Sequence, residues 1–134
     1  MSVSDFTPGS STGAVDGPSP IAFDFTEEDH EGYVMLAPCG GICNSTVKYM
    51  KNRLYDLSCE EGCKIVMSMK DVDFIDSVGL GTMITAHKNC DEYGGMIVYC
   101  SMKPMILKNM QLLNMDKFLK ITPDLQSALN LLDW

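Results

Sequence analysis

The chain has 134 residues, of which 46% are hydrophobic and 21% charged, and its formal net charge at pH 7 is -8. This length suits one domain with a core large enough to fold without disulfides or structural metals. Its 10 lysines and arginines against 18 acidic residues exclude the clustered basic surface that nucleic-acid binding requires, and the charge favours a basic protein partner.

No stretch approaches the run of about 18 apolar residues that crosses a membrane, and the N-terminus lacks the basic start and apolar segment of a secretion signal. We therefore expect a cytoplasmic protein with no membrane insertion. Its 6 cysteines are expected to be reduced there. The spacing of Cys39 from Cys43, and of Cys59 from Cys63, is CxxxC rather than the CxxC common in zinc sites, so we predict no metal site.

Residues 1–20 are rich in serine, glycine and proline and contain only isolated apolar residues. Such a segment cannot bury enough surface to offset the entropy lost on ordering. We interpret it as a flexible N-terminal tail, whose deletion should leave stability nearly unchanged, followed by one domain over residues 21–134.

The domain should begin with a β-hairpin. Residues 21–26 alternate between apolar and polar, which predicts a half-buried edge strand, and residues 33–37 predict a second strand that returns antiparallel beside it. The acidic residues 27–32 would form the turn. The proline and glycines within 38–41 are expected to end the second strand.

Helices and buried strands should follow in alternation. Apolar positions from Ser45 onward recur at helical spacing, and that helix should end near 58–62. The apolar run at 64–69 is typical of a strand buried on both faces. A helix over 77–93 and a strand over 96–100 repeat the unit, which predicts parallel strands joined by helices.

Two prolines mark the last helices. Pro104 is placed as the first residue of a third helix, and Pro123 as the first residue of a fourth, after the N-cap candidate Thr122. The predicted fold class is therefore α/β: a mixed sheet of four to five strands, with an antiparallel edge hairpin and then parallel strands, flanked by about four helices.

One stretch stands out for function. Asp76 and Ser77 precede a helical pattern, and Ser77 is a natural N-cap whose hydroxyl could satisfy a free amide of the first turn. Gly79 and Gly81 carry no side chains that would keep a partner or an anion from the backbone. Taken alone, a serine here is most often only a cap.

Enzymatic interpretations of this stretch lack necessary residues. Residues 75–79 resemble a nucleophile elbow with Ile75 in place of its first glycine, but His87 would lie about 15 Å along the helix from Ser77. Residues 79–84 begin like a dinucleotide fingerprint, but Ile84 replaces its third glycine. We therefore predict that the protein is not an enzyme. A hydrolase ranks third among the candidate functions, after the two binding functions given below.

The sequence FIDSVGLG at 74–81, followed by Gly94-Gly95 before a short strand, resembles the signature of STAS domains, and specifically of bacterial anti-sigma factor antagonists. The turn at 40–42 and the segment 112–121, where a helix would end before a last short strand or extended segment, add to the similarity, which covers roughly 21–134. The resemblance implies a STAS-like sheet. It also implies that Ser77 is phosphorylated by the anti-sigma factor, a protein kinase.

The resemblance implies a binding switch in transcription regulation. Unphosphorylated on Ser77, the protein would bind an anti-sigma factor kinase and so release a sigma factor, and a serine phosphatase would reset it. ATP and Mg²⁺ would be carried by the partner kinase, with no cofactor held here. The implied partner surface comprises two segments: Gly41, Ile42, Cys43, Asn44 and Ser45, with Asp76, Val78, Gly79, Leu80 and Gly81.

Two positions depart from the family pattern. Many members have a second serine or threonine at the position of Val78 and an aspartate at the position of Cys43. The alternative function is therefore a STAS docking subunit, not phosphorylated, of a signalling scaffold or a transport system. Phosphate on Ser77 would separate the two.

Overall fold

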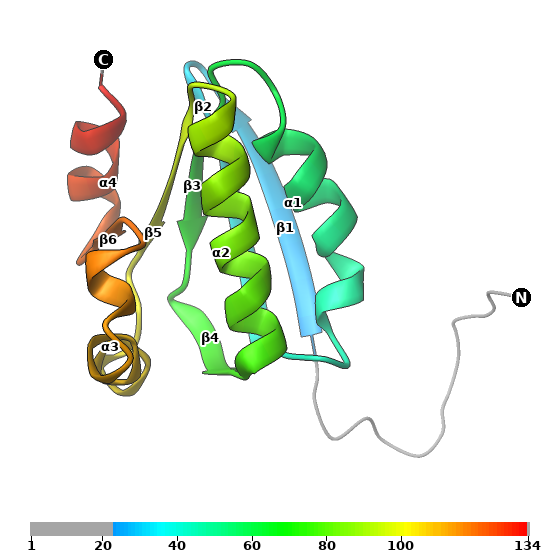
Figure 1. Cartoon of the computed structure of the whole chain (residues 1–134), viewed down its shortest axis with the longest axis vertical. Coiled ribbons are helices and arrows are strands. Elements are labelled where there is room, and N and C mark those ends of the chain that lie inside the picture. Colours follow the sequence, from blue (N-terminus) through cyan, green and yellow to red (C-terminus); the bar gives the residue numbers. More distant parts are fainter. Residues whose placement is uncertain (1–22, 134) are drawn as a thin grey trace, which may run out of the picture.

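The computed structural model describes residues 23–133; the predicted tail and the start of the first predicted strand lie outside the described residues. Within them, helices pack on both faces of a mixed sheet (Figure 1). Helices α1 (Lys51–Ser58) and α2 (Ser77–Glu92) pack on one face. Helix α4 (Leu125–Leu132) packs on the other, and α3 (Pro104–Leu112) lies near the start of α2.

The sheet has six strands in the described part of the chain, in the order β1-β2-β3-β5-β6, with β4 also paired to β2. Their bounds are β1 Phe23–His30, β2 Tyr33–Ile42, β3 Lys64–Ser68, β4 Asp71–Ile75, β5 Met96–Cys100 and β6 Ile121–Thr122. The β1–β2 pair is antiparallel and the other pairs are parallel. The predicted α/β class, edge hairpin and parallel strands are confirmed, with a slightly larger number of strands.

The end of β2 differs from the prediction. The strand does not stop in the 38–41 segment but continues to Ile42, because its last residues pair with β4, a strand that was not predicted from the sequence. The register shifts between Gly40 and Gly41, and Gly40 has a φ of 106°, which favours glycine. This irregular pairing carries the end of β2 to the start of α2.

Two boundaries near the start of the domain also differ. Acidic residues expected in the hairpin turn belong to β1, which runs to His30, and the turn is Glu31–Gly32. The helix expected from Ser45 begins as a 3-10 turn at Val47–Tyr49, and α1 itself starts at Lys51. The cause is the loop before it, which folds back on the end of β2 through hydrogen bonds described below.

The last two helices begin at acid-capped or proline-marked positions. Pro104 is the first residue of α3, as predicted. Helix α4 starts later than predicted: Asp124, rather than Thr122, is its N-cap, and its side chain accepts a hydrogen bond from the N–H of Ser127 at 2.8 Å. Pro123 therefore precedes the helix.

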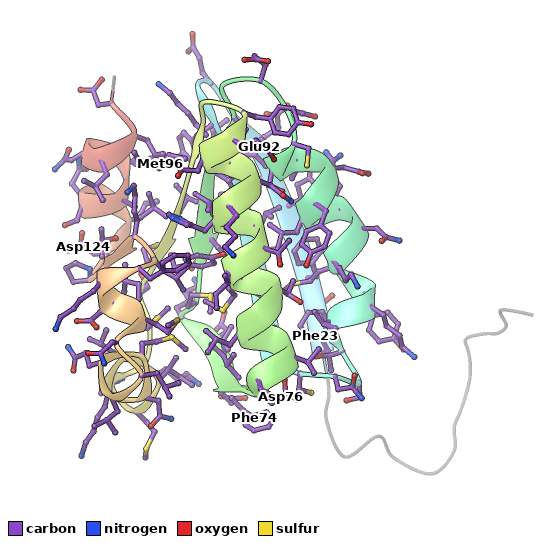
Figure 2. All side chains as sticks on the ribbon, viewed as in Figure 1. Phe23, Phe74, Asp76, Glu92, Met96 and Asp124 are labelled. Atoms are coloured by element: carbon purple, nitrogen blue, oxygen red, sulfur yellow. The ribbon has the colours of Figure 1, made fainter. Side chains whose placement is uncertain are left out.

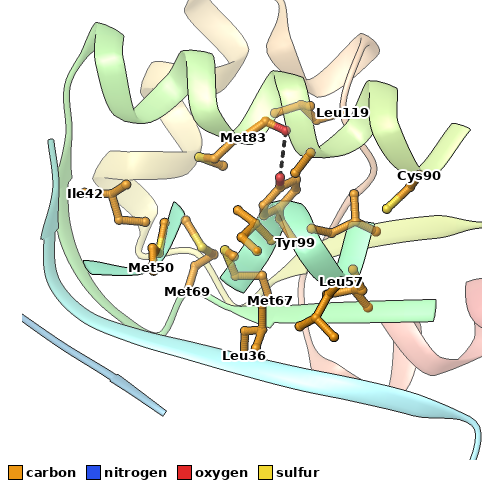
Figure 3. Close-up of a cluster of buried hydrophobic side chains, with 14 of the residues drawn as sticks. Leu36, Ile42, Met50, Leu57, Met67, Met69, Met83, Cys90, Tyr99 and Leu119 are labelled. Carbon is orange, nitrogen blue, oxygen red and sulfur yellow. Dashed lines mark hydrogen bonds between the residues drawn. The ribbon is translucent and has the colours of Figure 1, made fainter. Parts of the chain in front are cut away.

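The larger core lies between the sheet and helices α1 and α2 (Figure 3). Leu36, Met67 and Tyr99 point into it from β2, β3 and β5, and none of them is exposed. The Tyr99 hydroxyl donates a hydrogen bond to the carbonyl of Met83 at 2.8 Å, drawn as a dashed line. This contact joins α2 to the sheet and so helps to fix the position of the helix start.

The smaller core lies under α4, where Val66 and Val98 meet Ala128. Successive residues of a strand face opposite sides of a sheet, which is why β3 and β5 contribute to both cores.

Among residues 23–133, none of the helices has the length and apolar character needed to cross a membrane.

Candidate functional site

Helix α2 begins at Ser77, and its N-cap is Asp76. One carboxylate oxygen of Asp76 accepts a hydrogen bond from the N–H of Gly79 at 2.8 Å. The prediction that Ser77 is the cap is therefore wrong by one residue, because the preceding carboxylate takes the free amide. Ser77 is exposed, and no group among residues 23–133 hydrogen-bonds its hydroxyl.

Asp76 also joins the helix start to the loop that follows β2. Its second carboxylate oxygen accepts a hydrogen bond from the N–H of Asn44 at 3.0 Å, and its own N–H donates to the carbonyl of Ile42 at 3.2 Å. The N–H of Gly79, followed by that of Asn44, holds the pKa of Asp76 below its usual value. The structure thus brings the two segments of the predicted surface side by side, at the end of α2 where Figure 2 labels Asp76 and Phe74.

Replacing Asp76 by asparagine is expected to lower the free energy of unfolding at pH 7 by about 1 to 2 kcal/mol, since the charged acceptor of two backbone N–H groups is lost. Because the pKa of Asp76 is lower in the folded chain, its stabilising effect is complete above the unfolded pKa of about 4 and disappears as the pH falls through the folded pKa. Urea denaturation of both proteins from pH 7 to pH 2.5 would measure the difference.

The free energies of unfolding of wild type and Asp76→Asn should therefore become equal at acid pH. Asp56→Asn, at an exposed position of α1, is the control and should change stability little at either pH. A difference between wild type and Asp76→Asn that stays constant down to pH 2.5 would contradict this role of the carboxylate.

The loop at 43–46 is held by a side chain that sequence reasoning missed. The buried Thr46 hydroxyl accepts a hydrogen bond from the N–H of Cys43 at 2.9 Å and donates to the carbonyl of Gly41. The Cys43 sulfur lies 3.3 Å from the Ser45 hydroxyl and 3.6 Å from that of Thr46, and these hydrogen bonds hold the pKa of Cys43 below its usual value. A threonine soon after a glycine turn was the available signal.

The predicted surface residues differ in exposure. The exposed ones are Asn44, Ser45, Val78 and Gly81; the half-buried ones are Asp76 and Leu80; and the buried ones are Gly41, Ile42, Cys43 and Gly79. The exposed group can contact a partner directly, whereas the buried group can only shape the surface from beneath.

Two glycines of α2 have different structural roles. A Cβ placed on Gly79 would lie 2.1 Å from the carbonyl oxygen of Ile42, so only glycine lets the helix start lie against the end of β2. A Cβ placed on Gly81 would meet nothing within 4 Å. The fold therefore requires glycine at 79 and has no use for it at 81.

An apolar groove lies beside Ser77, between the start of α2 and α3. Its volume is about 420 Å³, and its lining residues are Ile75, Asp76, Ser77, Leu80, Ile106, Asn109, Met110, Leu112 and Leu113. Leu112 and Leu113 are 72% and 56% exposed. Sequence reasoning missed the groove because it depends on where α3 lies relative to β4 and the start of α2.

Two further kinds of chemistry were considered for this site: nucleophilic catalysis by Ser77 with a histidine base, and metal binding. His87 lies ten positions after Ser77 on α2, its ring packs against Phe118 with centroids 5.0 Å apart, and burial lowers its pKa. No group of three or more metal-ligating side chains is found in the part of the chain that the structure describes. What the geometry does present is an exposed hydroxyl at a helix start, surrounded by a loop and an apolar groove.

These features define an α/β domain with an accessible serine at a helix start. The chain belongs to the STAS domain family, whose match covers residues 24–128. It is 27% identical over 106 residues to the anti-sigma F factor antagonist of Paenibacillus polymyxa, an alignment that covers 78% of this chain and 88% of that relative.

Solved structures share the fold. An anti-sigma factor antagonist from Mycobacterium paratuberculosis has a TM-score of 0.72 at 23% identity, with 85% of this chain and 97% of that chain covered. The anti-sigma factor antagonist SpoIIAA in its unphosphorylated form has a TM-score of 0.60 at 16% identity, with 80% and 96% covered. SpoIIAA of Bacillus has also been solved in its phosphorylated form. The predicted family and fold are thus confirmed.

Proposed function

We propose that this protein is a bacterial, cytoplasmic anti-sigma factor antagonist that works as a binding switch and not as an enzyme. Without phosphate on Ser77 it binds an anti-sigma factor kinase and so releases a sigma factor. The kinase brings ATP and Mg²⁺, and a serine phosphatase restores the binding form. The observation that carries the proposal is the exposed Ser77 hydroxyl, which Asp76 leaves free by capping α2 in its place.

The position of Ser77 suits phosphorylation. A kinase needs an accessible hydroxyl, and no hydrogen bond from residues 23–133 has to be broken before this one can react. The product is also tolerable, because a helix N-terminus stabilises a negative charge by about 0.3 to 1 kcal/mol. The nearby Asp76 carboxylate opposes this effect, but its charge is already shared between two N–H groups.

The surroundings of Ser77 suit a protein partner. Exposed Asn44 and Ser45 belong to the loop that is hydrogen-bonded to Asp76, and exposed Val78 follows Ser77 in the chain. The helix surface at Gly81 has no side chain, so another chain can approach the backbone there. The groove next to them offers an apolar site for a side chain of the partner. Burying such a side chain would supply affinity, while the contact at Ser77 would supply control.

The relatives support the same proposal. The Paenibacillus relative is named for antagonism of an anti-sigma factor, and the phosphorylated and unphosphorylated structures of SpoIIAA indicate that this fold accommodates both states. Cys43, at the position of the family's usual aspartate, is 3% exposed and faces Ser45 and Thr46, so here it shapes the loop from beneath.

The proposal is tested by detecting phosphate on Ser77. Protein isolated from its native cells, and purified protein incubated with the candidate anti-sigma factor, ATP and Mg²⁺, should each show a mass increase of one phosphate localised to Ser77 by peptide mass spectrometry. Ser77→Ala should show none. A kinase preparation that phosphorylates another antagonist but leaves Ser77 unmodified would count against the switch and favour the docking-subunit alternative.

A further inference from the structure

Two buried thiols face each other at the end of α2 opposite Ser77. Cys90 lies in the last turns of α2 and Cys63 directly precedes β3, and their sulfur atoms are 3.4 Å apart. Cys63 is 9% exposed and Cys90 is 1% exposed. Figure 3 shows Cys90 at the edge of the core. Neither residue takes part in the site around Ser77.

The backbone holds this pair in place. The N–H of Gly95 donates to the carbonyl of Cys90, and the N–H of Met96 donates to that of Cys63, both at 2.7 Å. A Cβ on Gly95 would lie 2.5 Å from the Cys63 sulfur. The backbone of the turn before β5 therefore packs closely against this thiol. Cys63 also donates to the carbonyl of Ser58 at 3.5 Å. The two sulfurs therefore have little freedom to separate.

We infer that Cys63 and Cys90 form an oxidisable dithiol, a modification site that closes to a disulfide when the protein meets a small peroxide. A disulfide bond is about 2.05 Å long, so the sulfurs need to approach by roughly 1.4 Å. Rotation of the two side chains can supply an approach of this size, since the sulfurs already lie in contact at 3.4 Å.

The reaction with hydrogen peroxide balances without any other reagent. The sulfur of Cys63, the more exposed of the two, attacks one peroxide oxygen, the O–O bond breaks, and a sulfenic acid and one water form. The sulfur of Cys90 then attacks the sulfenic sulfur, the S–O bond breaks, and a second water leaves. Two thiols and one peroxide thus become one disulfide and two waters, with both thiol protons in the waters.

Access and pH control the rate. Cys63 reaches the surface through its 9% exposed area, and a hollow of about 10 Å³ lined by Cys90 and Gly95 has room for about one water molecule; both favour a small oxidant. Burial raises the pKa of both thiols, so the reactive thiolate becomes more abundant, and oxidation faster, as the pH rises above neutrality. The titratable groups facing the pair or lining the hollow are Glu60, Cys59, Asp91, Tyr99, His87 and Lys120.

The experiment uses the full chain with Cys39→Ser and Cys59→Ser, which removes the exposed thiols. Hydrogen peroxide at pH 8.5 should convert the protein to a form lighter by two hydrogens, with the peptides of Cys63 and Cys90 joined. The disulfide closes a loop that contains β3, β4 and most of α2, so the melting temperature should rise by about 10 °C and return to its starting value on addition of a reductant.

Two controls separate the pair from buried cysteines in general. Cys90→Ala should show no reversible rise in melting temperature on oxidation, whatever its own stability. Cys100→Ala, which removes a thiol that is also 1% exposed but lies under α4, should keep the full rise. A wild-type disulfide that joins Cys59 to Cys63, or peroxide treatment that adds oxygen without joining Cys63 to Cys90, would overturn the inference.

Discussion

Replacing Gly79 by alanine is expected to lower the free energy of unfolding by about 3 kcal/mol or more, because the new methyl group has no room. It would lie 2.1 Å from the carbonyl oxygen of Ile42 and 2.8 Å from the carbonyl carbon. Both atoms belong to the backbone at the end of β2, which cannot move aside as the tip of a side chain could. Helix α2 would have to shift away from β2 and break the hydrogen bonds of Asp76.

Gly81→Ala is the matched control, two residues further along the same helix. Its methyl group would meet nothing within 4 Å, so alanine should raise stability by about 0.5 to 1 kcal/mol through its higher helix propensity. Urea denaturation of the three proteins, followed by circular dichroism, measures both effects. Equal stability of Gly79→Ala and wild type would show that α2 does not depend on this close approach.

Gly81→Ala also tests the proposed surface, because the variant is expected to fold at least as well as wild type. If a partner approaches the backbone at this position, the added methyl group should weaken binding while stability rises. Opposite changes in these two quantities would identify a glycine kept for contact and not for folding.

Phosphorylation of Ser77 is expected to weaken binding of the anti-sigma factor by a few orders of magnitude while leaving the domain folded. The phosphate adds about 1.5 to 2 negative charges at the start of a helix, where they are tolerated. In a complex shaped around a hydroxyl, the same charges would be desolvated without a matching cation. That penalty is several kcal/mol, and each 1.4 kcal/mol corresponds to a factor of about ten in affinity.

Two variants separate charge from the loss of the hydroxyl. Ser77→Asp should fold and bind weakly, whereas Ser77→Ala should bind well and keep binding in the presence of kinase and ATP. Since Asp76 is the N-cap, Ser77→Ala removes no cap and should cost less than about 0.5 kcal/mol of stability. Titration calorimetry against the candidate anti-sigma factor measures all three proteins, and equal affinities would leave no role for charge at this position.

Local patterns in the sequence predicted the elements that depend on local interactions. The helix over 77–93 corresponds to α2, the strand over 96–100 to β5, and Pro104 opens α3. The continuation of β2 to Ile42 was missed because it depends on pairing with β4, about thirty residues later, and the glycines between suggested a turn. Long-range pairing overrode the local signal.

The candidate site was predictable in part for the same reason. The sequence placed Ser77 at a helix start, but it could not decide between two adjacent capping residues. That choice rests on the hydrogen bonds of Asp76 to Gly79 and Asn44, and the latter is distant in sequence. The burial of Cys43 depends on the folding of its loop around Thr46. The groove depends on tertiary packing alone.

The two ends of the strand order limit how this chain can aggregate. Strand β1, at one end, carries four acidic residues among its eight, and a second copy pairing with it would bring like charges together. Strand β6, at the other end, has only two residues and offers a short template. Neither edge strand is therefore a good template for pairing with strands of further copies. An acidic protein that carries an exposed apolar groove can thus resist association through the edges of its sheet.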